Sequence, residues 1–147
     1  MNKQLLLIAL FLSLIGSVLS QNQSRVNANL SSAISHTNNK EYMEAIIACT
    51  YTIKSDSSNA DAYYLRAYGF FMLDNKPAAL KDVNRSISIN PNNSDSYILR
   101  GKIFKALGKY IAAYKDLKTA NSLNPAGTLL GVTKIMFSSV LPGSKSD

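Results

Sequence analysis

The sequence predicts an all-α fold: an α-solenoid of three antiparallel helix pairs followed by a C-terminal capping helix. Residues 60–93 align without a gap on residues 94–127, and thirteen of the aligned positions are identical. Apolar residues recur at helical spacing in both copies, and no stretch of strand length alternates apolar and polar residues. Units of this period cannot bury their apolar faces alone, so they stack side by side.

Each of the two clear copies predicts a helical hairpin. Residues 61–73 carry apolar side chains around most of a helix, which therefore needs neighbours on two sides. Short turns are expected at 74–75 and 108–109. Asn90-Pro91 and Asn124-Pro125 should end the second helices, because proline cannot continue the hydrogen-bond ladder. Small residues should let the paired helices approach closely, and these are Ala67, Ala79, Gly101 and Ala113.

The residues of this repeat resemble the tetratricopeptide repeat (TPR), whose pattern spaces aromatic, Leu-Gly, aromatic, Ala, apolar and Pro positions along each unit. In the last copy these positions hold Tyr97, Arg100-Gly101, Phe104, Ala113, Leu117 and Pro125. In the copy before it they hold Tyr63, Arg66-Ala67, Phe70, Ala79, Val83 and Pro91. Arg stands where the pattern has Leu, so we expect this slot to turn partly to solvent. Because Arg66/Arg100 and Asp82/Asp116 recur together, we expect surface ion pairs of little energetic weight.

A third, degenerate copy precedes these two, at residues 26–59, and completes a TPR domain of 26–59, 60–93 and 94–127. The small and apolar positions are kept by Ala33, Ala45 and Ile53. Other positions have drifted, and these hold Asn29, His36, Cys49 and Ser57. Terminal repeats are often atypical because they cap the stack.

The two ends of the chain are expected to lie outside the repeats. Residues 1–20 have the short positive start, apolar stretch and small-residue end of a signal peptide, with cleavage before Gln21 and a linker at 21–25. An uncut signal anchor is the alternative. The chain is therefore expected to be exported to a periplasm, a secretory lumen or the medium, with no transmembrane span after cleavage. Residues 128–139 predict an apolar seventh helix that caps the groove or mediates self-association, and 140–147 a disordered tail.

Chemistry-bearing residues are few. Cys49 is the only cysteine, and it could face His36 in the skeleton of a thiol site, although both fit better as core replacements. No metal-ligand cluster or phosphate-binding glycine loop is visible, so we expect neither an enzyme nor a cofactor. The net charge is +7, and the third repeat contributes six basic against two acidic residues. An acidic partner would suit this surface, whereas nucleic acid is excluded because the lysines lack interleaved aromatics.

The resemblance to TPR proteins implies that the first helix of each pair lines a concave groove. Its lining would be Leu30, Ile34, Asp61, Tyr64, Tyr68, Phe71, Ile98, Lys102 and Lys105. This set predicts a groove for a peptide or protein segment with apolar anchors and an acidic end. The alternative is that the aromatics only complete contacts between repeats.

One TPR subclass holds chaperone tails in a carboxylate clamp of Lys, Asn, Asn, Lys and Arg. The corresponding positions here are Leu30, Ile34, Leu65, Asp95 and Leu99, none of which can donate a charge-assisted hydrogen bond. The sequence therefore predicts an exported, non-enzymatic binding module without the clamp. The alternative function is a structural subunit that assembles through the apolar C-terminal helix.

Overall fold

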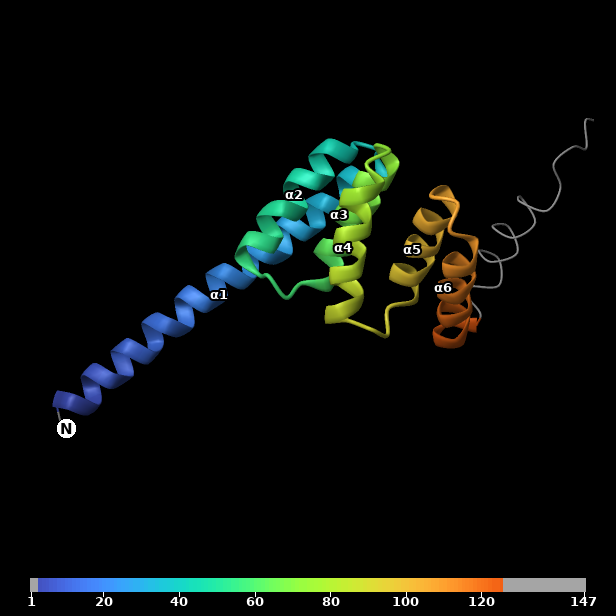
Figure 1. Ribbon diagram of the computed structural model, residues 1–147. Coiled ribbons are helices and arrows are strands. Elements are labelled where there is room, and N and C mark those ends of the chain that lie inside the picture. The colour runs from blue at the N-terminus through green and yellow to red at the C-terminus, as the bar shows by residue number, and fades with distance from the viewer. Residues whose placement is uncertain (1–2, 126–147) are drawn as a thin grey trace, which may run out of the picture.

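The computed structural model describes residues 3–125, which form six α-helices and no strand within that range. The helices are α1 (Lys3–Asn38), α2 (Tyr42–Ser55), α3 (Ala60–Met72), α4 (Lys76–Ile89), α5 (Ser94–Ala106) and α6 (Tyr110–Leu123). They form three antiparallel hairpins that pack side by side, from α1/α2 to α5/α6 (Figure 1). This confirms the predicted α-solenoid, while the expected helix at 128–139 and tail at 140–147 lie outside the described residues.

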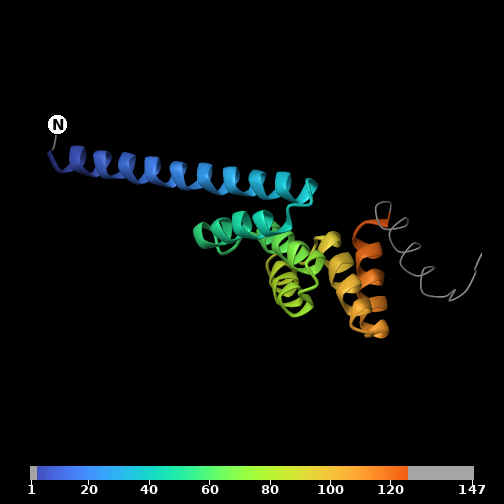
Figure 2. The same ribbon diagram turned by 90° about the horizontal axis from the view of Figure 1, so that it is seen from above.

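The first helix is longer than the repeat requires. It runs without interruption through residues 21–25, which the sequence analysis assigned to a linker, because no Gly or Pro in that segment stops it. Its N-terminal half projects from the hairpins as a straight rod (Figure 2). The first buried residue is Val26, where packing against the domain begins. By length and composition this helix could also cross a membrane.

Each hairpin turns through one residue in the left-handed backbone region. These residues are Lys40 (φ 64°), Asp74 (φ 61°) and Gly108 (φ 72°), one at the same place in each repeat. Only the third is glycine, the residue that adopts this conformation without steric cost. The turns at 74–75 and 108–109 are confirmed.

Asparagines begin the helices that follow the predicted boundaries. The Asn59 side chain accepts a hydrogen bond from the Ala62 amide, and Asn93 accepts from the amides of Asp95 and Ser96. Such caps satisfy amides that have no partner inside the helix.

The core lies where α3, α4 and α5 meet. Its buried members are Ala67, Ala79, Val83, Leu99 and Ile103. Small residues do allow close approach, most tightly at Gly69, where a Cβ atom would stand 2.9 Å from Cγ1 of Ile46 on α2. The hairpins therefore fit against one another with little freedom to slide.

Candidate peptide-binding groove

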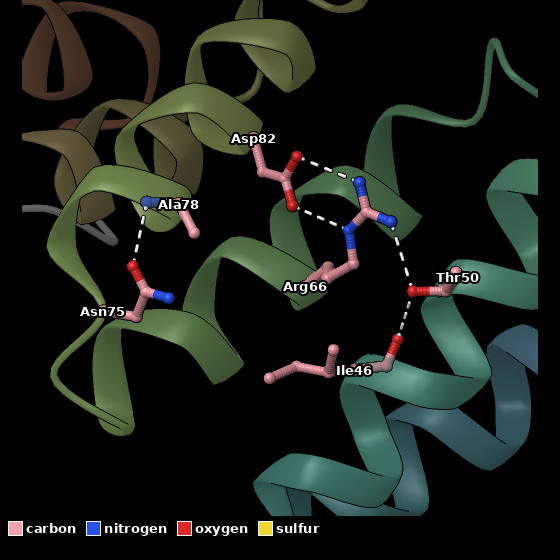
Figure 3. Close-up of polar contacts among 6 residues, drawn as sticks. All are labelled: Ile46, Thr50, Arg66, Asn75, Ala78 and Asp82. Atoms are coloured by element: carbon pink, nitrogen blue, oxygen red, sulfur yellow. Dashed lines mark hydrogen bonds and ion pairs between the residues drawn. The ribbon is translucent and has the colours of Figure 1, made fainter.

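A buried ion pair fixes the second hairpin and ties it to the first. The Arg66 guanidinium on α3 donates to both carboxylate oxygens of Asp82 on α4, at 2.7 and 3.0 Å. Its remaining terminal nitrogen donates to Oγ1 of Thr50 on α2, at 3.2 Å. Figure 3 shows the guanidinium between these two partners, so one side chain joins three helices.

The same arrangement recurs one repeat later. Arg100 donates to both oxygens of Asp116, at 2.7 and 2.8 Å, and to Oδ1 of Asn84 on the preceding hairpin, at 2.8 Å. The predicted ion pairs are confirmed, but the expectation that they lie at the surface is wrong: Asp82 is 4% exposed and Asp116 is 6% exposed. The bidentate pair therefore joins the two helices of each hairpin, and the third hydrogen bond of each arginine links that hairpin to the one before it.

The predicted groove residues lie on α1, α3 and α5, and α3 contacts both α1 and α5. On α1, Leu30 is half-buried and Ile34 is 46% exposed. The remaining residues divide into the half-buried Tyr64, Tyr68, Phe71, Ile98 and Lys105 and the exposed Asp61 and Lys102.

Two of these residues meet in a hollow of about 490 Å³ between the first and second hairpins. The hollow is lined by Thr37, Asn38, Lys40, Tyr42, Tyr64, Leu65 and Tyr68. The rings of Tyr42 and Tyr68 meet edge to face, with centroids 6.2 Å apart and planes at 71°. Its volume lies within the range of small-ligand sites. The other predicted residues do not line it, and these are Leu30, Ile34, Asp61, Phe71, Ile98, Lys102 and Lys105.

Sequence reasoning missed the lining residues around the first turn. Thr37, Lys40 and Tyr42 lie at the end of α1, in the turn and at the start of α2, whereas the groove prediction considered only the first helix of each pair. The signal was present: one repeat later, Phe71 and Met72 stand at the positions of Thr37 and Asn38. The short side chains of the first repeat leave the space open.

The titratable side chains that line the hollow are three tyrosines and one lysine. Burial raises the pKa of the Tyr64 phenol to about 12, and the nearby carboxylate of Asp95 adds to the rise. The phenol therefore stays protonated at neutral pH and can donate a hydrogen bond. No acidic residue lines the hollow, and Lys40 supplies its one charged side chain.

The possible thiol site is not assembled. Nδ1 of His36 contacts Oε2 of Glu41 at 2.6 Å. The Cys49 side chain is fully buried, and that burial raises the pKa of its thiol to about 12. A catalytic thiol needs the opposite shift, so Cys49 is a core residue. The described part of the chain also holds no group of His, Cys, Asp or Glu that could bind a metal.

Stacked helical hairpins, with a hollow between the first two, define this chain as an α-solenoid. Residues 94–126 match the sequence profile described as tetratricopeptide repeat. The chain therefore carries a tetratricopeptide repeat and has the TPR fold.

Solved TPR domains share this fold. The Arabidopsis OM64 TPR domain matches with a TM-score of 0.72 at 23% identity, over 80% of this chain and 98% of that one. The first TPR domain of Spaghetti (RPAP3), bound to the HSP90 peptide SRMEEVD, matches at 0.70 and 24% identity, over 78% and 93%. The TPR2B domain of yeast Sti1, in complex with pHsp70, matches at 0.70 and 22% identity, over 78% and 92%. None of the curated proteins compared with the chain matches it in sequence.

Proposed function

We propose that this chain is a non-enzymatic binding module that holds a peptide or protein segment in its concave groove after export. The observation that carries the proposal is the open hollow around Tyr64 and Tyr68, between two hairpins that the hydrogen bond from Arg66 to Thr50 joins. Half-buried aromatic side chains on a rigid support are typical anchors for a partner. Two of the similar solved domains hold chaperone peptides, which supports a peptide as the occupant.

The mode of binding proposed here differs from that of a carboxylate clamp. At the clamp positions that the resemblance implies, Leu99 is 2% exposed and Asp95 is acidic. Neither can bind a carboxylate. The groove instead offers apolar and aromatic contacts beside the exposed Lys102 and Lys40, which favours an apolar segment with an acidic residue or end.

Selection from a displayed library of random peptides tests the proposal directly. The immobilised chain should enrich peptides with apolar anchors, and replacing Tyr64 and Tyr68 with Ala should remove the enrichment while leaving helicity unchanged. Replacing Tyr51 with Ala gives a control, because this tyrosine is 59% exposed on α2 and lines no part of the hollow. Equal enrichment by the parent and the Tyr64/Tyr68 variant would reject the groove.

A second function is favoured by the last hairpin. Tyr110, Ile111 and Tyr114 lie exposed on α6, and Ile111 is 77% exposed. An apolar surface of this kind suits assembly with another copy or with a larger complex. Sedimentation velocity decides between the two functions: a binding module should sediment as a monomer, whereas an assembly subunit should form oligomers that an Ile111→Lys variant does not.

A further inference from the structure

The hollow belongs to one junction between repeats. At the next junction, the larger Phe71 and Met72 stand in place of Thr37 and Asn38. Phe71 packs against the hydrophobic core there. The hollow is therefore lined on this side by two shorter side chains than the next junction has, and its tyrosines are also particular to this junction, since Lys76, Ile98 and Lys102 stand at the positions of Tyr42, Tyr64 and Tyr68.

The walls of the hollow are suited to an aromatic ring. Tyr42, Tyr64 and Tyr68 line it together with Leu65, and the edge-to-face contact of Tyr42 with Tyr68 sets the geometry that a further ring would continue. The Tyr64 hydroxyl, like any phenol at neutral pH, is protonated and able to donate a hydrogen bond.

The rim is suited to an anion. Lys40 lines the hollow, and its ammonium makes no ion pair with any residue in the described range. The adjacent carboxylate of Glu41 contacts His36, at 2.6 Å. Positive charge at this rim is therefore left for a ligand.

The hairpin turn places Lys40 at the rim of the hollow. Its φ of 64° recurs at the equivalent Asp74 (φ 61°) and Gly108 (φ 72°), so this conformation belongs to the turn of every repeat. Only in the first repeat does this turn position carry a cation.

We propose that the hollow is an anchor subsite for an aromatic residue at the C-terminus of a peptide. The ring enters between the tyrosines and the terminal carboxylate meets Lys40. The tyrosines and Lys40 border one hollow, so a residue that carries its ring and its carboxylate on the same backbone unit can contact both. This inference rests on the proposed peptide-binding function and specifies its anchor.

Small probes test the subsite on the chain as its host produces it. Titration of N-acetylphenylalanine, followed by NMR of the tyrosine rings, should show saturable binding. N-acetylalanine, which lacks the ring, should bind at least about tenfold more weakly because the apolar burial is lost. N-acetylphenylalanine amide, which lacks the charge, should bind about threefold more weakly.

The chain's own repeats supply the variants. Thr37→Phe with Asn38→Met, the residues that the second repeat has at these positions, should place larger side chains in the hollow and weaken the binding of N-acetylphenylalanine at least about tenfold. Lys40→Gly, copied from the third repeat, should erase the preference for acid over amide while keeping the ring contact. Circular dichroism checks that each variant folds, and Asn38→Met alone, at an exposed position, is the substitute should the double variant fail to fold.

Unchanged binding of N-acetylphenylalanine by the filled variant would overturn the subsite. Equal binding of acid and amide by the parent would overturn the role of the carboxylate. Library selection separates these failures from failure of the groove itself. Suppose that the parent and the filled variant enrich the same peptides equally, and that the Tyr64/Tyr68 double-alanine variant does not. The groove proposal would then stand and the subsite proposal would be wrong.

Discussion

Replacing Asp82 with Asn tests how strongly the buried ion pairs hold the solenoid together. The Asp82 carboxylate accepts two hydrogen bonds from Arg66, and the Arg66 side chain is only 18% exposed. Removing one partner of a fully buried pair costs about 3–5 kcal/mol, because the remaining charge stays buried. Asn keeps one acceptor oxygen and Arg66 retains some solvent, so we expect a loss of about 2–3 kcal/mol in the free energy of unfolding.

Urea denaturation followed by circular dichroism measures this loss. A domain of this size has an unfolding free energy of about 5–15 kcal/mol, so the midpoint should fall visibly. The control is the same substitution at Asp74, whose side chain is 85% exposed, and which should change stability by less than about 0.5 kcal/mol. If Asp82→Asn unfolds at the same midpoint as Asp74→Asn, the buried pair does not stabilise the fold and the reasoning fails.

Three further predictions concern packing, pH and the N-terminus. Gly69→Ala should destabilise the fold by about 1–2 kcal/mol in urea, because its Cβ would overlap α2, whereas Gly101→Ala should be near neutral since its contacts begin at 3.3 Å. Burial raises the pKa of the Cys49 thiol from 9.0 to about 12, so its contribution to stability is complete below pH 9 and declines as the pH rises toward 12, by at most about 1.4 kcal/mol per pH unit. The urea midpoint measured on either side of pH 9 should show this slope, and a Cys49→Ala variant with the same slope would contradict it. A chain that begins at Gln21 should unfold at the same midpoint as one that begins at residue 25, because packing starts at Val26; a lower midpoint for the shorter chain would place stabilising contacts before it.

The fold could be predicted because its determinants are local and repeated. Pro91 and Asn75 mark helix boundaries by backbone chemistry, and the pairing of Arg66 with Asp82 followed from their recurrence one repeat later. The sequence did not predict that the Asp82 carboxylate of this pair is buried. Burial depends on how the neighbouring hairpin covers it, and no pattern within one repeat reports that.

The groove was predicted in part, for a related reason. Tyr64 and Tyr68 follow from helical spacing on α3, but the hollow beside them is defined by Thr37 and Asn38, which matter for their small size. An absence of volume leaves no apolar or charge pattern along a single helix. The left-handed turn that places Lys40 at the rim is likewise a backbone property, which the lysine itself does not signal.

One uninterrupted helix carries both the apolar N-terminal stretch and part of the lining of the hollow. Thr37 stands seventeen residues beyond residue 20 on α1, a distance of roughly 26 Å along the axis. Cleavage within this helix would separate the domain from the apolar stretch. If the apolar stretch stayed in a lipid bilayer, the straight helix would instead hold the hollow at a fixed height and orientation above the headgroups.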